Sequence, residues 1–317
     1  MKTLFRATAV AAFCLTPVAS QAAEIIFAHG ANAGNPRYDA ANMFADLVGA
    51  CSAHTVNVAP SATMGDDAEM LISAQSGVIQ MTANSQGAMA QIVPEVGMLG
   101  LPFLFASLPD AWEVLDGDVG ALIDEKAQAA GMKVVGFWDN GIRNVTHVSK
   151  HIASPADIKG MKIRTPPDEV TLAMFNQMDA NPAPLAWSEL PTALQSGAFE
   201  GQENPLTNIY SAKLHEITPY ITMTGHKYET TPVVAGLAWW SGLSAEDQAC
   251  ISSAVEQAGW YQRGRSHVDN LSLRATMEAE GAKFLDVDQA AFAEATAPVY
   301  DQYAEQFGDI VSMLRDN

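Results

Sequence analysis

Short apolar segments with strand character alternate with helical segments near the start of the chain, and this order limits the fold more than any other feature. Residues 24–29, 55–59 and 78–83 have the composition and spacing of strands, whereas residues 37–48 carry apolar side chains at helical spacing. A second helix is expected to start after Met64-Gly65-Asp66-Asp67. Strand, loop and helix in repeated order predict an α/β fold.

The second part of the chain returns to the first, which predicts two lobes rather than two independent domains. Residues 133–138 and 228–237 have strand patterns, and Asp139-Asn140-Gly141 is a turn signal at which the chain could cross between lobes. No repeat or flexible linker separates the halves. We expect residues 23–140 and 230–265 to form lobe 1, and residues 141–229 and 266–317 to form lobe 2.

A helical pattern of unusual length follows the returning strand. It starts at Ser244, with Asp247 placed for a capping arrangement, and continues to about residue 280. Helices of ordinary domains are shorter, so this segment predicts a helix that crosses both lobes, with a bend near Gly259 or Gly264. Residues 288–307 predict one last helix.

The first 22 residues have the pattern of a signal peptide. Lys2 and Arg6 precede an apolar segment over residues 7–18, and Ser20-Gln21-Ala22 supplies small residues for cleavage near Ala22. This segment is shorter than the roughly 20 apolar residues that span a bilayer. We therefore expect an exported, soluble protein in the periplasm.

Acidic residues outnumber basic ones by 36 to 17, a formal charge of -19. Such a charge argues against nucleic acids and anionic membrane surfaces as partners. It also repels small anions at long range, so an anion site would need a local concentration of positive charge. Each arginine inside the fold is therefore informative.

Two cysteines, Cys51 and Cys250, remain after removal of the signal peptide. An even number in an oxidising compartment predicts a disulfide, which would close a loop of about 200 residues. The alternative is two separate buried thiols.

The stretch 160–205 carries the best candidates for ligand binding. Arg164 lies on a short apolar strand that two prolines end, so its planar guanidinium projects from a rigid edge. A structural ion pair is the alternative for one arginine alone. Trp187 stands at the start of a helix that Ser188 could cap, and Asn204 follows later in the stretch.

Signatures of enzymes are largely missing, whereas residues suited to binding are present. No Gly-rich phosphate loop, Gly-x-Ser-x-Gly motif or His-Glu-x-x-His motif occurs. Arg143 and Arg164 could hold a carboxylate from two sides, with an aromatic wall and an asparagine beside it. The polar loop at Asn84 follows a strand, where open α/β sheets bind ligands. We expect no metal and no cofactor.

Two histidines have open assignments. His29 ends the first strand, where it could contact a ligand or serve as a structural residue. His226 lies near the returning crossing and could contact the ligand directly or through water.

A competing function is an exported enzyme that acts on an acidic sugar, with Glu203 or Asp139 as acid or base. A ligand sensor for a receptor would have the same cleft and a different partner.

Several motifs in the same order resemble the substrate-binding proteins of tripartite ATP-independent periplasmic (TRAP) transporters, the DctP-like family. The resemblance covers nearly the whole chain after the signal peptide, and its motifs are Met64-Gly65-Asp66-Asp67, Trp138-Asp139-Asn140-Gly141-Ile142-Arg143, Lys159-Gly160-Met161-Lys162-Ile163-Arg164, Pro184-Leu185-Ala186-Trp187-Ser188-Glu189 and Gly201-Gln202-Glu203-Asn204-Pro205.

This resemblance implies two α/β lobes that close on a small organic anion, and a monomer that delivers the anion to a TRAP membrane permease without chemistry. It implies that Arg164 makes the main salt bridge to the carboxylate, that Arg143 assists, and that Asn204 hydrogen-bonds nearby.

Trp187, Asn84 and Asp66 match positions that line the pocket in the family. Sialic-acid-binding members carry phenylalanine at the position of Trp187 and an acidic residue at that of Asn84. The ligand is therefore expected to be a smaller or differently hydroxylated acid, either a C4-dicarboxylate or a sugar acid, with a keto acid or a sulfonate also open.

Overall fold

The computed structural model describes residues 23–315, so the expected signal peptide and its cleavage site lie outside the described residues. Within them, the strands form one sheet in the order β2-β1-β3-β8-β4-β7-β5-β6, with β9 beside β8. The strands are β1 (Glu24–His29), β2 (Thr55–Ala59), β3 (Met81–Ala83), β4 (Met132–His147), β5 (Lys162–Thr165), β6 (Asn181–Pro184), β7 (Gly201–Asn204), β8 (Tyr220–Gly236) and β9 (Lys283–Asp286).

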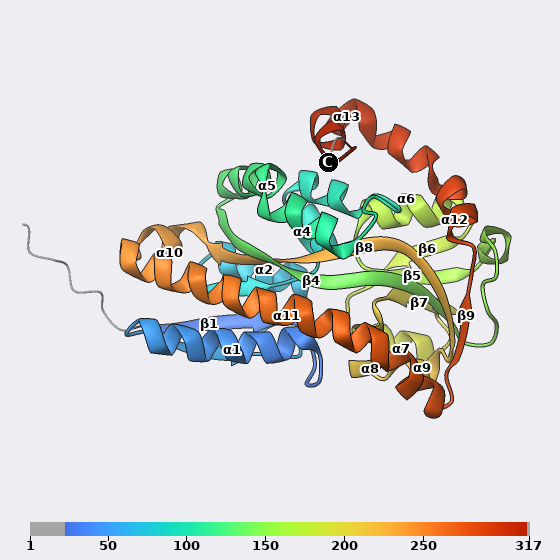
Figure 1. Cartoon of the computed structure of the whole chain (residues 1–317), viewed down its shortest axis with the longest axis horizontal. Helices are drawn as coiled ribbons and strands as arrows, with labels where there is room; N and C mark the ends of the chain where they lie inside the picture. Colours follow the sequence, from blue (N-terminus) through green and yellow to red (C-terminus); the bar gives the residue numbers. More distant parts are fainter. Residues whose placement is uncertain (1–22, 316–317) are drawn as a thin grey trace, which may run out of the picture.

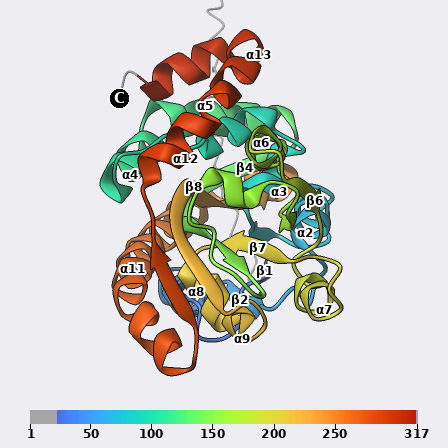
Figure 2. The same cartoon turned by 90° about the vertical axis from the view of Figure 1, so that its right-hand side faces the viewer.

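Helices cover the sheet on both sides (Figures 1 and 2). They are α1 (Pro36–Cys51), α2 (Asp67–Gln75), α3 (Gln86–Ala90), α4 (Leu108–Asp116), α5 (Asp118–Ala129), α6 (Glu169–Gln177), α7 (Leu190–Gln195), α8 (Leu206–Ser211), α9 (Leu214–Ile217), α10 (Leu237–Ser241), α11 (Ala245–Ala279), α12 (Gln289–Thr296) and α13 (Pro298–Arg315), with 3-10 helices η1 (Pro94–Gly100) and η2 (Pro155–Ile158). The α/β class predicted from the order of segments is confirmed.

The sheet divides into two lobes that share two long strands. β1 pairs in parallel with β2 and β3 in one lobe, and β5 pairs in parallel with β6 and β7 in the other. β4 and β8 pair with each other antiparallel and cross both lobes. Trp138 on β4 lies edge-on to Phe27 in the first core, whereas Ile221 on β8 belongs to a separate core of the second lobe.

The expected turn at Asp139-Asn140-Gly141 is wrong, because β4 continues through it. The strand is irregular there: its register against β8 shifts between Asp139 and Gly141, which face Thr230 and Glu229. Gly141 has a φ of 123°, a backbone conformation that favours glycine. The turn-forming residues therefore bend a long strand instead of ending it. The division of the lobes at 140/141 and 229/230 falls at this irregularity and stays a prediction.

The long helix is confirmed as α11, 35 residues that run along both lobes (Figure 1). The Ser244 side chain caps it by accepting from the backbone N–H of Asp247. Gly259 does not interrupt the helix but lets it lie close to the sheet, since a Cβ there would stand 2.9 Å from Cδ1 of Trp138.

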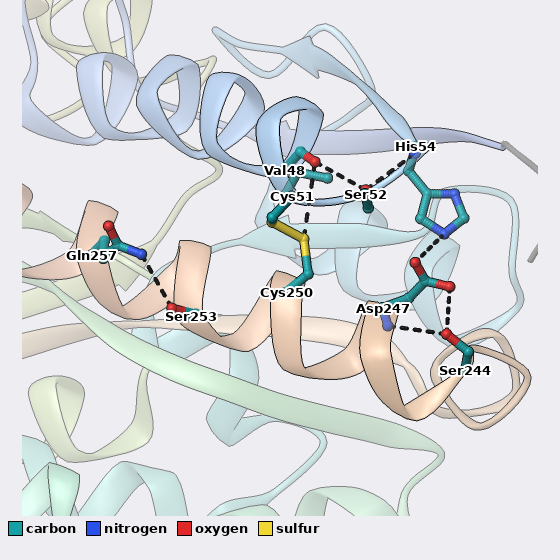
Figure 3. Close-up of a disulfide and its surroundings, with 9 residues drawn as sticks. All are labelled: Val48, Cys51, Ser52, His54, Ser244, Asp247, Cys250, Ser253 and Gln257. Atoms are coloured by element: carbon teal, nitrogen blue, oxygen red, sulfur yellow. Dashed lines mark hydrogen bonds and ion pairs between the residues drawn. A yellow bond between two sulfur atoms is a disulfide. The ribbon is translucent and has the colours of Figure 1, made fainter.

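Cys51 and Cys250 form the predicted disulfide (Figure 3). The bond joins the end of α1 to the first third of α11, with 5.8 Å between the two Cα atoms. His54 faces Asp247 at 3.5 Å beside it, so a second contact ties the same elements. The alternative of two separate thiols is therefore wrong.

The C-terminal segment differs from the single helix expected over residues 288–307. It forms α12 and α13, and α13 packs against η1, α5 and α6. Figure 2 shows α13 beyond α5 at one end of the molecule. Among residues 23–315, no helix combines the length and apolarity needed to cross a membrane.

Candidate functional site

Four of the predicted site residues meet at a small cavity between the lobes. They are Arg143, Arg164, Trp187 and Asn204. The cavity has a volume of about 50 Å³. Its other lining residues are mostly polar: Gly30, Ala31, Asn35, Arg37, Asp67, Ser85, Asn140, Pro166, Asn208 and Ser211. Side chains from both lobes thus face one small shared volume.

Arg164 is a buried cation without a carboxylate partner among the described residues. It lies on β5, is 3% exposed, and donates from Nε and Nη2 to the carbonyl oxygen of Leu185 at 3.0 and 2.6 Å. Burial, together with the positive charge of Arg143, lowers the pKa of Arg164 to about 10. The structural ion pair considered as an alternative is absent here, so the charge remains available to a ligand.

Arg143, in contrast, is already neutralised. Its guanidinium binds the carboxylates of Glu203 and Glu229, and Nη2 also donates to the carbonyl oxygen of Glu203 at 2.6 Å. Burial would lower the pKa of Arg143, but these two carboxylates raise it above its usual value. Arg143 can therefore orient the cavity wall, while Arg164 offers the unpaired charge.

Trp187 forms one wall and is held by a contact between the lobes. The next residue, Ser188, donates from its hydroxyl and its backbone N–H to the two carboxylate oxygens of Asp66, at 2.7 and 3.2 Å. The expected role of Ser188 as the cap of α7 is therefore wrong, since Glu189 occupies that position. The Ser188 side chain instead joins the start of α7 to the start of α2 in the opposite lobe.

The other predicted site residues lie outside the cavity lining. Asp66 contacts Ser188, as described. Asn84 is buried and donates to the carbonyl oxygen of Asp67 at 3.0 Å. His29 accepts at Nδ1 from the backbone N–H of Ala31, at 3.1 Å.

His226 has protein partners on both ring nitrogens. It contacts Thr224 at 2.8 Å and the carboxylate of Glu203 at 3.1 Å. Burial lowers its pKa, although Glu203 opposes this effect. His226 thus orients Glu203, which in turn holds the lining residue Arg143.

Sequence reasoning missed Arg37 and Asp67, the charged lining residues of the first lobe. Arg37 lies in the first turn of α1 and donates from Nη2 to Thr231 at 2.7 Å and to Asn140 at 3.1 Å. Asp67 opens α2, and its Oδ2 accepts from the backbone N–H of Ser85 at 2.9 Å. Charged residues are common in the first turn of a helix, so their position alone does not indicate a binding site. The only signal in the sequence was that Asp67 belongs to the same motif as Asp66.

A chain of amides joins the lobes beside the arginines. Asn208 on α8 donates to Asn140 at 2.9 Å and to Asn204 at 3.1 Å. Its own carbonyl oxygen accepts from Asn35, which caps α1, at 2.8 Å. Residues separated by more than 170 positions are thereby placed around one volume, which no local pattern could reveal.

A larger groove of about 770 Å³ lies between α5, β4 and α11. Its charged lining residues are Asp116, Asp124, Glu256 and Arg263, and Arg263 is bound to Asp116 at 2.5 and 2.8 Å. An anion would meet excess negative charge in this groove. The smaller cavity is therefore the candidate site, although its volume is less. No group of three metal-binding side chains occurs in the part of the chain that the structure describes.

His29 should make the folded state sensitive to acid. Burial and the charge of Arg37 lower its pKa from 6.5 to about 3. Below pH 6.5 the unfolded state binds a proton at this histidine that the folded state does not. The stability that the neutral histidine contributes is therefore complete above pH 6.5 and is lost as pH falls toward 3. It amounts to about 1 kcal/mol for each pH unit between about 6 and 4.

We expect His29→Asn to remove this slope, because the asparagine carbonyl can replace Nδ1 as acceptor for Ala31 without titrating. Urea unfolding at pH 4, 5, 6 and 7 would measure how the unfolding free energy depends on pH. His267→Asn, at an exposed position of α11, should keep the wild-type slope. Equal slopes for His29→Asn and wild type would contradict the assignment.

Comparison with known proteins agrees with this architecture. Residues 27–306 match the family described as bacterial extracellular solute-binding protein, family 7 (DctP). The 2,3-diketo-L-gulonate-binding periplasmic protein YiaO of Escherichia coli is 31% identical over 289 residues, which are 90% of this chain and 88% of YiaO.

An uncharacterized protein of Sinorhizobium fredii, y4mM, is 42% identical over 292 residues, 91% of this chain. The chain spans about half of that relative, 53% of its length. Among solved structures, a TRAP periplasmic solute-binding protein of Bordetella bronchiseptica has a TM-score of 0.90 and 31% identity, over 93% of this chain and 99% of the other. Its ligand density was interpreted as pantoate.

Proposed function

This chain belongs to the DctP family of bacterial extracellular solute-binding proteins, and on that premise we propose that its cavity binds the carboxylate of a small organic acid through Arg164. The single observation that carries the proposal is the unpaired charge of Arg164. A buried guanidinium without a counter-ion is costly, and a ligand carboxylate would supply the missing partner. Proteins of this family are the solute-binding components of TRAP transporters, which take up sugar acids and dicarboxylates.

The other predicted residues support the same site in different ways. Arg143 shapes the cavity wall, Trp187 provides an apolar wall, and Asn204 supplies an amide at the cavity surface. Two charge-assisted hydrogen bonds at roughly 1.5–3 kcal/mol each, with partial burial of the ligand, suffice for micromolar affinity. Asn84, His29 and His226 are buried outside this lining, and Asp66 joins the lobes through Ser188, so we assign these four residues to its support.

Closure of the lobes would complete the site. Arg164 and Trp187 come from the second lobe, whereas Arg37 and Asp67 come from the first. A ligand that contacts both lobes binds the closed form more tightly than the open form, and this difference in affinity drives closure. The irregularity of β4 near Gly141 is a suitable place for the bend.

Transport without chemistry fits the site better than hydrolysis of an acidic sugar. The two carboxyl groups considered as acid or base, Glu203 and Asp139, do not line the cavity. Although burial opposes ionisation, Arg143 and His226 lower the pKa of Glu203 to about 2, so it cannot donate a proton near neutral pH. Oδ1 of Asp139 already accepts hydrogen bonds from the Tyr228 hydroxyl and the Trp112 indole N–H.

We infer that the protein works as a monomeric periplasmic carrier that delivers the intact acid to a TRAP membrane permease. A thermal-shift screen of organic acids tests this proposal. An acid at a hundred times its dissociation constant should stabilise the fold by roughly 2.7 kcal/mol, a shift of roughly 5 °C. Mass spectrometry of the released compound should then recover it unchanged. Turnover of the acid, or a screen in which no organic acid binds, would overturn the proposal.

A further inference from the structure

The first lobe presents a second charged surface to the cavity, formed by Arg37 and Asp67. Arg37 is 6% exposed, has no ion pair among the described residues, and its buried Nε has no hydrogen-bond partner. Its Nη2 is held by Asn140 and Thr231, so the guanidinium is fixed in orientation. A residue that lines the cavity therefore retains a hydrogen-bond donor without a partner among the described residues.

Asp67 places an acceptor on the same wall. Its Oδ2 is taken by the backbone N–H of Ser85, while Oδ1 accepts no hydrogen bond from the residues that the structure describes. This oxygen lies near Gly30, where an added Cβ would stand 3.4 Å from Oδ1 and 3.7 Å from Cδ1 of Trp187. The free carboxylate oxygen thus lies near the wall contributed by the opposite lobe.

A donor and an acceptor on one wall suit a hydroxyl group, which both accepts and donates. A carboxylate could accept from Arg37, but it has no donor for Asp67 and would meet the negative charge of Asp67 at short range. The wall therefore discriminates between a hydroxyl and a second carboxylate at the end of the ligand that Arg164 does not bind.

The balance of charge around the cavity points the same way. Three positive groups, Arg37, Arg143 and Arg164, are matched by Asp67 and by the two carboxylates bound to Arg143, Glu203 and Glu229. The formal charges of these six groups therefore sum to zero before a ligand binds, although Arg164 is not itself paired with a carboxylate. A monocarboxylate adds one buried negative charge, whereas a dicarboxylate adds two, and burial of uncompensated charge is unfavourable.

We propose that Arg37 and Asp67 form a second subsite that binds hydroxyl groups, so that the ligand is a polyhydroxy monocarboxylate of the aldonate type rather than a dicarboxylate. This inference rests on the proposed function, because it assumes that Arg164 binds the carboxylate. It assigns the two ends of the ligand: the carboxylate to the second lobe and the hydroxyl-bearing carbons to the first.

Matched pairs of acids test the subsite. D-Erythronate and meso-tartrate have the same carbon chain, but the terminal hydroxymethyl group of the first is a carboxylate in the second. D-Galactonate and galactarate form the same kind of pair, and succinate has no hydroxyl. By calorimetry, we expect at least one aldonate to bind ten times more tightly than its paired dicarboxylate and than succinate. Tighter binding of a dicarboxylate, or no binding of either aldonate, would overturn the subsite.

Asp67→Asn should reduce this preference at least tenfold, since it removes the repulsive charge and keeps an oxygen that can accept from Ser85. Asp46→Asn makes the same change of charge at an exposed position of α1 and should leave the preference as in wild type. Circular dichroism would verify the fold of both variants. An unchanged preference in Asp67→Asn would refute the role of this carboxylate.

Arg37→Gln should weaken aldonate binding at least tenfold, and aldonate affinity equal to wild type would remove Arg37 from the subsite.

Different results would contradict the subsite and the proposed function. If a dicarboxylate binds best and needs Arg164, only the subsite is wrong. If no organic acid in the screen binds, or if binding survives Arg164→Ala, the proposed function itself is wrong.

Discussion

Arg164→Ala is expected to abolish acid binding while the ligand-free protein unfolds at the wild-type denaturant concentration. The guanidinium would make charge-assisted hydrogen bonds to the ligand carboxylate, at roughly 1.5–3 kcal/mol each. Loss of two such bonds weakens binding by at least a hundredfold. Calorimetry with the tightest acid from the screen would measure this loss.

The stability of the same variant separates ligand binding from a structural role. Arg164 has only the carbonyl oxygen of Leu185 as a partner among the described residues, so its removal eliminates a buried charge without leaving a carboxylate unpaired. Arg143→Ala should behave differently, because it strands Glu203 and Glu229 and costs about 3–5 kcal/mol of stability.

Arg274→Ala provides the matched surface control for both measurements. Arg274 lies on α11 and pairs with Glu278 and Asp286 at partly exposed positions. Neither affinity nor stability should change by more than a few tenths of a kcal/mol. A strongly destabilised Arg164→Ala that still bound the acid would show that Arg164 is structural.

Removal of the disulfide has the largest expected effect on stability. Cys51 and Cys250 are 199 residues apart, and the chain-entropy model assigns roughly 5 kcal/mol to the closure of such a loop. We expect the double variant Cys51→Ala/Cys250→Ala to lose about 3–5 kcal/mol of unfolding free energy in urea. Its affinity for the acid should change little, because the bond lies outside the cavity lining.

Reductant supplies the internal control for this prediction. Cys51 is exposed at the end of α1, so dithiothreitol should reach the bond in wild type and lower its unfolding midpoint toward that of the double variant. The double variant itself should not respond. Equal midpoints for oxidised wild type, reduced wild type and the double variant would show that the bond does not stabilise the fold.

Strand β1 and helix α1 of the first lobe followed from local pattern because each buries apolar side chains at regular spacing. β1 and α1 lie where alternation and helical spacing placed them. Strand β7 (Gly201–Asn204) was missed, since Gln202, Glu203 and Asn204 are polar and yet buried. Their burial depends on partners such as Arg143 and Asn208, which lie far away in sequence.

Asp139-Asn140-Gly141 and Ser188 show how tertiary contacts override a correct local preference. The first is a good turn sequence, but pairing with β8 on both sides keeps it in a strand and uses Gly141 at an irregularity. The second is a good cap residue, but Asp66 of the opposite lobe competes for its side chain. In both cases the stronger interaction comes from a distant segment.

The sequence by itself determined the α/β class, the long helix and the disulfide, and it made Arg164 a candidate for carboxylate binding. These follow from residue type, spacing and short-range order. Only the tertiary structure decided that Arg164 has no ion pair with residues 23–315 while Arg143 has two, and that Arg37 and Asp67 line the same cavity. Whether a buried charge is free or neutralised depends on which carboxylates fold against it, and that is set by packing across the whole chain.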